Sequence, residues 1–321
     1  MTPILVPIVA SFGLTVPNTS SRSITTPAGT SDMLEVIMPV TLPKEKIIET
    51  VKKENACLVW GGSMQIAPAD DVLINIERPL HMESQDKYMV SIIAKKIAMK
   101  VSHLLVDIPY GKGAKVHSLE ELTEVKAGFE NLARQFGIVL DVYPREALSP
   151  DGYGVGPLLE IRDVLRVFER SPQRPQMLES LAIDMAGRLL ELACAVPEGQ
   201  GNAMARAKLE SGEAEEKFWS IALEQGAEKK VRSTDLIETE CSHTVAADHS
   251  GMISRSGNEE VVKIARALGA PFIKEAGMYL YKLQGDSVTA GEPLVTLYAS
   301  SPERLDIGVE VLSQHKNFIE Y

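Results

Sequence analysis

The chain has 321 residues, a formal net charge of −11, and a composition of 45% hydrophobic and 24% charged residues. This length and balance are typical of a globular protein with two or more domains. The acidic excess, with no long basic run, disfavours broad binding to nucleic acids or to anionic membranes. The three widely spaced cysteines, Cys57, Cys194 and Cys241, make no disulfide framework, so we expect a reducing, cytoplasmic location.

Residues 1–17, MTPILVPIVASFGLTVP, are apolar enough to be compared with a signal peptide or a membrane segment. They lack a basic start and are interrupted by Pro3, Pro7 and Gly13. They are also too short to cross a bilayer. We therefore expect a buried helix in this segment.

Residues 19–35, TSSRSITTPAGTSDMLE, place several hydroxyl side chains around a single arginine, Arg22. The segment Pro27–Gly29 predicts a turn, and Thr30 to Asp32 are typical of the cap of a following helix. Hydroxyls, a guanidinium, a glycine and a helix N-terminus are groups that bind a phosphate. The alternative is a serine- and threonine-rich surface loop that only caps a helix.

The pattern up to residue 142 alternates amphipathic helices with short apolar strands. This alternation predicts an α/β fold with a largely parallel sheet, flanking helices, and ligands at the carboxyl ends of the strands. The predicted helices span residues 43–55, 84–102 and 119–136, and the predicted strands span residues 56–60, 72–76, 104–108 and 138–142.

The rest of the chain divides into a helical and a β-rich part. Helices are predicted at residues 158–169, 176–194, 202–211 and 213–225, and short β-rich runs at 244–247 and 278–283 flank a helix at 259–268. The pattern GDSVTAGEPL at 285–294 resembles the barrel-sandwich modules of lipoyl and biotinyl carriers. Because no lysine lies at the expected hairpin, we expect an α+β barrel-sandwich-like domain without that cofactor.

These patterns predict four segments. Residues 1–76 form the first part of an α/β phosphate-binding domain, and residues 77–102 belong to a helical subdomain. Residues 103–232 complete the α/β domain with a helical extension, and residues 233–321 form the C-terminal α+β domain.

Several polar side chains lie where they could reach a ligand. Ser91 and Lys95 are four residues apart and share one face of the predicted helix, although a solvated lysine beside an incidental serine is the simpler interpretation. Glu83 precedes that helix and is either a general acid or a carboxylate that interacts with the helix dipole. Lys115 lies in the glycine-flanked loop GKGAKVH, which is either a phosphate-binding loop or a mobile basic loop.

Metal binding is not expected. Cys241, His243 and His249 are far short of a zinc pattern, because one cysteine and two histidines on different sides of a strand do not make a tetrahedral ligand set.

The run SRSITTPAGT at 21–30 resembles the phosphate- and nucleotide-binding segment of the thymidine phosphorylase family, and it is most similar to the archaeal-type AMP phosphorylase branch. Further matches follow in the same order along the chain. They are Ala67–Asp70, Arg78–Leu80, Ser91 with Lys95 and Lys96, and Gly154–Pro157 leading to Glu160 and Arg162.

The resemblance implies roles for most of these residues. Phosphate would be held by Ser20, Arg22 and Thr30. The nucleotide would be held by Ser21, Arg22, Ser23, Ile24, Thr25, Thr26, Ser91 and Lys115. Lys95 matches a lysine that contacts the base in pyrimidine phosphorylases, and its role in the AMP branch is less defined. Glu83 stands where AMP phosphorylases have an aspartate, and it would act as the general acid.

Two departures favour the AMP branch over the pyrimidine branch. Glu77 occupies the position of the base-reading arginine of pyrimidine phosphorylases, and Thr26 replaces the histidine of the glycine-rich segment. The implied reaction converts AMP and phosphate to adenine and ribose 1,5-bisphosphate without a cofactor, in an enzyme that is at least a dimer. The alternatives are a thymidine or other pyrimidine nucleoside phosphorylase, and a catalytically inactive fragment that only binds or scaffolds.

The resemblance also implies an N-terminally truncated chain. Relatives carry an earlier helical segment and a lysine-x-serine, glycine-rich phosphate loop before this point, and Thr2 would be the last residue of that loop. We therefore expect residues 1–321 alone to be poorly soluble or partly unfolded, and nearly inactive.

Glu83→Gln is expected to bind AMP nearly normally and to lose activity by about 10²–10⁴-fold, because glutamine keeps the shape of the side chain but delivers no proton. Steady-state kinetics and calorimetry with AMP measure the two effects separately. An unchanged turnover number would leave Glu83 with a helix-capping role.

Overall fold

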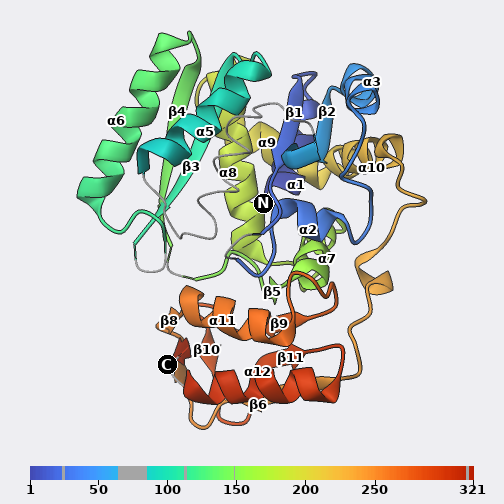
Figure 1. Ribbon diagram of the computed structural model, residues 1–321, viewed down its shortest axis with the longest axis vertical. Coiled ribbons are helices and arrows are strands. Elements are labelled where there is room, and N and C mark those ends of the chain that lie inside the picture. Colours follow the sequence, from blue (N-terminus) through green and yellow to red (C-terminus); the bar gives the residue numbers. More distant parts are fainter. Residues whose placement is uncertain (24–25, 64–84, 112–113, 148, 316–317) are drawn as a thin grey trace.

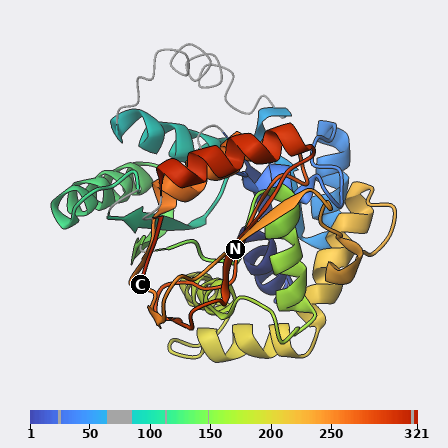
Figure 2. The same ribbon diagram turned by 90° about the horizontal axis from the view of Figure 1, so that it is seen from below.

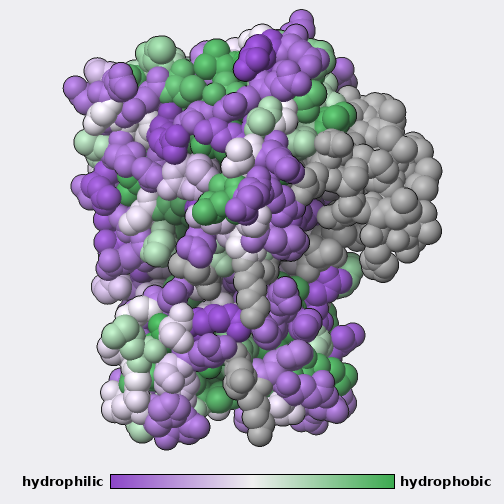
Figure 3. All heavy atoms as spheres, turned by 90° about the vertical axis from the view of Figure 1, so that its left-hand side faces the viewer, coloured by the Kyte–Doolittle hydropathy of each residue, from purple (hydrophilic) through white to green (hydrophobic). Residues whose placement is uncertain are grey.

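The computed structural model describes residues 1–23, 26–63, 85–111, 114–147, 149–315 and 318–321. Figure 1 shows a larger part, which contains the described helices from α1 to α10, above a smaller C-terminal part. The space-filling view in Figure 3 shows a constriction of the surface between these two parts. Ligands often bind at such boundaries, and the cavity described below lies here.

The core of the larger part surrounds the first helix. Helix α1 (Thr2–Ala10) is apolar on all sides, and Ile4, Val6 and Ile8 have no exposed surface. It packs against α8 (Gln176–Leu192) and α10 (Glu213–Gln225). A helix that is apolar all round has no face suited to water, so it is covered by other helices. The predicted buried helix is confirmed.

The strands of the larger part are parallel, as predicted. Strand β1 (Val16–Ser20) runs beside β2 (Ala56–Trp60), and β3 (His103–Tyr110) runs beside β4 (Val139–Glu146). The α/β class is therefore confirmed, although the described strands form two separate pairs. The strand predicted at 72–76 lies outside the described residues, and β1 was not predicted, because its sequence VPNTS is short and polar.

The helices between these strands follow local signals. Helix α3 (Lys44–Glu54) precedes β2, and α6 (Leu119–Gln135) connects β3 to β4. Ser118 caps α6, since its hydroxyl accepts a hydrogen bond from the Glu121 N–H at 3.2 Å. Helix α5 (Gln85–Ala98) ends four residues before the predicted end, at the point where Lys100 takes a positive φ of 55°.

The remaining elements of the larger part agree closely with the predicted helices. They are α2 (Thr30–Leu34), α7 (Pro157–Phe168) and α9 (Gly201–Glu210). Two short 3-10 helices, η1 (Gly61–Ser63) and η2 (Ser233–Asp235), were not predicted. Helix α10 begins and ends at the predicted residues. The helix ends at Gly226, which adopts the left-handed conformation with a φ of +108°.

The C-terminal part is an antiparallel sheet covered by two helices. The strand order is β5 (Gly154–Val155), β9 (Gly277–Leu280), β11 (Pro293–Tyr298) and β6 (Ser242–Ala246). Helices α11 (Asn258–Leu268) and α12 (Pro302–Gln314) pack on each other and on this sheet. Figure 2 shows α12 lying across this end of the molecule. Two short pairs complete this part: β7 (Gly251–Met252) with β10 (Ser287–Val288), and β8 (Arg255–Ser256) with β12 (Ile319–Glu320).

The edge strand β5 comes from the segment that leads into α7, so the motif GVGP joins the two parts. Gly156 has a φ of +112°, and a Cβ there would lie 2.5 Å from the Ala276 carbonyl oxygen. A Cβ on Gly277 of the facing strand would lie 2.1 Å from the Val155 carbonyl oxygen. Glycine is needed on both sides because the two backbones approach so closely.

A buried glutamine closes the free edge of β2. The Gln225 side chain accepts a hydrogen bond from the Leu58 N–H at 2.7 Å and donates to the Leu58 carbonyl at 3.0 Å and to the Pro39 carbonyl at 3.2 Å. The amide thus replaces the neighbouring strand that Leu58 lacks on this side.

Gln225→Leu is expected to lower the free energy of unfolding by about 1–3 kcal/mol for each of the Leu58 groups left without a partner. Urea denaturation followed by circular dichroism measures this free energy. Gln135→Leu, at an exposed position near the end of α6, is the matched control. Equal losses in the two variants would contradict the role given to Gln225.

Candidate functional site

The hydroxyl-rich segment begins on β1 and ends on α2. Ser20, the last residue of β1, forms a hydrogen bond with the Ser31 hydroxyl at 2.7 Å and donates a weaker one to the Val59 carbonyl at 3.3 Å. The Ser20 side chain therefore joins the strand to α2.

Asp32 organises the turn between them. One of its carboxylate oxygens accepts hydrogen bonds from the Ser23 N–H at 2.7 Å and from the Gly29 N–H at 2.8 Å. The residue that caps α2 is thus Gly29, not one of the residues from Thr30 to Asp32 as predicted. The predicted cap was wrong because Asp32 reaches back from the first turn of the helix, as the acidic residue of a capping box does.

Arg22 points to the surface. Its guanidinium lies 4.4 Å from the centre of the Trp60 ring, and it forms an ion pair with Glu35. Glu35 also accepts a hydrogen bond from Lys274 of the C-terminal part at 3.2 Å, and Lys274 donates to the Asp32 carbonyl at the same distance. Arg22 is thus already held by a carboxylate and an aromatic face.

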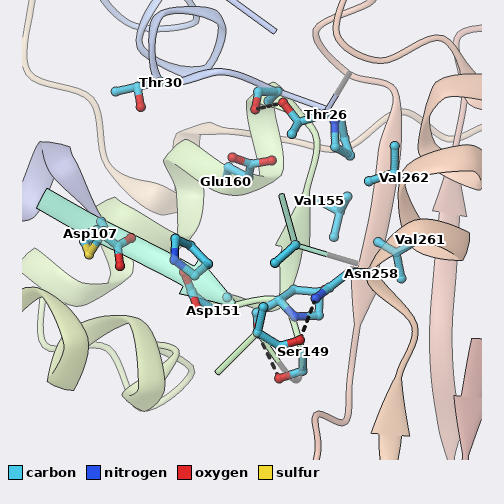
Figure 4. Close-up of a pocket in the computed structure, with 18 of the residues that line it drawn as sticks. Thr26, Thr30, Asp107, Ser149, Asp151, Val155, Glu160, Asn258, Val261 and Val262 are labelled. Atoms are coloured by element: carbon cyan, nitrogen blue, oxygen red, sulfur yellow. Dashed lines mark hydrogen bonds between the residues drawn. The ribbon is translucent and has the colours of Figure 1, made fainter. Parts of the chain in front are cut away.

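A cavity of about 1030 Å³ lies between the two parts of the molecule. Its walls come from the turn before α2, the carboxyl ends of β3 and β4, the start of α7, and α11 (Figure 4). The polar and charged lining residues are Thr26, Thr30, Asp107, Lys115, Arg145, Ser149, Asp151, Glu160, Asp163, Asn258, Glu259 and Lys263.

Three of the predicted ligand residues line this cavity, namely Thr26, Thr30 and Lys115. They come from segments almost 90 positions apart in the sequence, so the fold brings them together. The loop that carries Lys115 is closed by a hydrogen bond from the Gly111 N–H to the Val116 carbonyl at 2.8 Å.

The other predicted residues are placed differently or lie outside the described residues. Ser20, Ser21, Arg22 and Ser23 are absent from the cavity lining as the structure describes it. Ile24, Thr25 and Glu83 lie outside the described residues.

The predicted pair on α5 is present. The Lys95 ammonium donates a hydrogen bond to the Ser91 hydroxyl at 3.4 Å, so the two side chains share one face as expected. Neither is among the described lining residues, whereas the neighbouring Ile92 is. The predicted roles of Ser91 and Lys95 in binding a base remain predictions.

The wall formed by β3 and β4 carries an ion-pair cluster that the sequence pattern did not reveal. The Arg145 Nε–H donates to both oxygens of Asp107, at 2.9 and 3.2 Å, and its Nη1 donates to Asp151 at 2.9 Å. Burial raises the pKa of Asp107, and the hydrogen bond from Arg145 offsets part of this rise. The carboxyl ends of the parallel strands β3 and β4 lie side by side here. Ligand sites are common at such strand ends, and this was the one signal in the sequence that could have indicated the cluster.

Two further carboxyls enter the cavity from α7. Asp163 is almost fully buried and accepts a hydrogen bond from the Gly154 N–H at 2.7 Å, and burial raises its pKa. Glu160 accepts a hydrogen bond from the Gly156 N–H at 3.1 Å, and burial raises its pKa to about 8. Glu160 is therefore largely protonated at neutral pH.

Metal ligands and membrane helices were also sought. In the part of the chain that the structure describes, no three or more His, Cys, Asp and Glu side chains gather as a metal site requires. None of the described helices combines the length and the apolar character needed to span a bilayer.

Comparisons with known proteins find similar sequences over almost the whole chain. Residues 1–132 match the model of the glycosyl transferase family a/b domain, and residues 252–318 match that of the pyrimidine nucleoside phosphorylase C-terminal domain. An AMP phosphorylase of Pyrococcus furiosus is 42% identical over 94% of this chain and 60% of its own length. An AMP phosphorylase of Methanocaldococcus jannaschii is 40% identical over 96% and 61%. A putative thymidine phosphorylase of Legionella pneumophila (strain Corby) is 39% identical over 98% and 60%.

The chain is similar, along almost its whole length, to proteins named AMP phosphorylase and putative thymidine phosphorylase. It spans about 60% of the length of the curated relatives that it matches. The family model for the a/b domain covers the hydroxyl-rich segment and the loop of Lys115, and the C-terminal model covers α11, so the cavity is lined by residues from both matched regions.

Gly29→Ala is expected to weaken binding of inorganic phosphate by about 10–100-fold, since small displacements of positioning groups have large effects. The new Cβ would lie 2.5 Å from the Ser21 carbonyl oxygen and 2.8 Å from the Ser23 nitrogen, and would force this turn apart. Titration calorimetry measures the affinity. Gly61→Ala is the control, because its Cβ would come no closer than 3.4 Å to Thr19. Unchanged affinity in Gly29→Ala would exclude the turn from the phosphate site.

Proposed function

We propose that this chain provides the nucleotide-binding cavity of a phosphorylase that splits a nucleoside 5′-monophosphate, with AMP as the substrate. The observation that carries the proposal is that Thr26, Thr30 and Lys115 line one cavity. These are residues that the resemblance to AMP phosphorylases assigns to nucleotide and phosphate. The AMP phosphorylases named among the relatives, at 40–42% identity, support the same choice.

The dimensions and donors of the cavity suit two anions. A volume of about 1030 Å³ lies at the upper end of the range for ligand sites, which is enough for a nucleotide together with inorganic phosphate. Thr30, the first residue of α2, contributes a hydroxyl, and Lys115 adds a cationic donor from a different wall. Two separate groups of donors support a substrate that carries its own 5′-phosphate.

The proposed chemistry needs positioning and charge stabilisation. Phosphate attacks the anomeric carbon as the bond to the base breaks, through a transition state with oxocarbenium character. Protonation of the leaving adenine makes it a stable product, and Glu83 is the proposed general acid. The hydroxyls and Lys115 would hold both phosphates in place while the bond breaks.

A thymidine phosphorylase is the second candidate, because relatives from Legionella pneumophila carry that name. Phosphate-dependent release of adenine from AMP, compared with release of thymine from thymidine, separates the two functions. Release of neither base, by a preparation that is folded by circular dichroism, would favour an inactive binding protein.

Lys115→Ala is expected to weaken binding of AMP by at least about tenfold, which is the effect of losing one charge-assisted hydrogen bond of roughly 1.5–3 kcal/mol. Binding of adenosine, which lacks the 5′-phosphate, should hardly change. Calorimetry with both ligands measures the difference, and Lys126→Ala on the exposed face of α6 is the control. Equal affinity of the unmodified protein for AMP and adenosine would contradict a nucleotide substrate.

A further inference from the structure

The Glu160 carboxyl is the feature of the cavity that the proposed function does not use. It points into the cavity from the first turns of α7, on the side where Thr26 lies (Figure 4). One oxygen accepts the hydrogen bond from Gly156, and no ion pair within 4 Å joins Glu160 to a cation of the described side chains.

The charged groups around Glu160 leave it in a mostly acidic setting. Asp163 on α7 and Asp32 on α2 raise its pKa, and the amino group of Met1 at the start of α1 lowers it. Across the cavity, the Arg145 guanidinium is paired with the carboxylates of Asp107 and Asp151. Burial remains the largest cause of the raised pKa, so the neutral form persists to about pH 8.

We propose that Glu160 is a specificity-determining residue whose side chain, which faces the cavity beside Thr26, binds an oxygen of the phosphate-bearing ligand. A neutral carboxyl adds a donor to the hydroxyls of Thr26 and Thr30, whereas an ionised one repels a phosphate. The proposal rests on the proposed function only in that it places a phosphate-bearing ligand in this cavity.

The expected consequence is a loss of phosphate affinity as Glu160 ionises. If the ligand binds the protonated form, its dissociation constant rises about tenfold between pH 7 and pH 9, beyond any change due to phosphate itself. Glu160→Gln keeps an N–H donor and cannot ionise. The ratio of the wild-type to the Glu160→Gln dissociation constant for inorganic phosphate should therefore rise about tenfold over this range.

Calorimetry with inorganic phosphate at pH 6.5, 7, 8 and 9 tests this ratio, with Glu124→Gln on the exposed face of α6 as the control that follows the wild type. A ratio that stays constant with pH, or a wild type that does not bind phosphate, overturns the proposal. If phosphate binding shows the predicted ratio but AMP does not bind, the proposal stands and the proposed function falls.

Titration of the Glu160 carboxyl by carbon-13 NMR, assigned by its loss in Glu160→Gln, gives an independent readout. By reciprocity, saturating phosphate should raise the midpoint above its value near 8 in the free protein. The raised pKa also means that the wild type loses stability as the pH rises from about 4.5 to about 8, so Glu160→Gln should gain in melting temperature at pH 9 and not at pH 4. A midpoint below 6, or one that phosphate does not move, overturns the proposal.

Discussion

The carboxylate of Asp32 is the interaction on which the arrangement of the cavity depends. It accepts hydrogen bonds from two backbone N–H groups on either side of the Ser23–Gly29 turn, while the carbonyl of the same residue accepts one from Lys274. The backbone of Lys274 in turn accepts a hydrogen bond from Leu158 at the start of α7. One buried acidic residue therefore fixes the turn that carries Thr26 and connects it to the C-terminal part and to the helix that carries Glu160.

The cavity brings opposite electrostatic environments together. Thr26, Thr30 and Lys115 offer donors to an anion, whereas Asp107, Asp151 and Asp163 line the same cavity with carboxyl groups. Arg145 neutralises much of the charge of Asp107 and Asp151, and burial favours the neutral forms of Asp163 and Glu160. The acidic walls thus carry less negative charge than their composition indicates, which is compatible with an anionic ligand.

Sequence signals within a few residues predicted the ends of several helices well. The positions of individual side chains, by contrast, depend on contacts between residues that are far apart in the sequence. Ser118 and Gly226 mark helix ends through interactions within a few residues, so α6 and α10 were predicted closely. Arg22 was assigned to phosphate from its neighbours in the sequence, but Trp60 and Glu35 determine where its guanidinium lies.

The residues of the cavity also differ in how far the sequence indicates their role. Thr26, Thr30 and Lys115 were identified through the family resemblance, and the fold places them together. Glu160 was noted only as part of a matching motif, because its environment depends on α7 meeting the starts of α1 and α2. Nothing in the neighbouring sequence indicates that burial of this carboxyl will keep it protonated.

The short strand β5 has a consequence for how the protein can be divided. Its two residues belong in sequence to the larger part, yet they cover one side of β9 in the sheet of the smaller part. A fragment cut in the connection before β6 would leave β9 as an open edge, with main-chain groups ready to pair with another chain. The two parts are therefore interdependent units: a C-terminal fragment that is to remain monomeric must carry residues 154–155 with it, for example through a circular permutation.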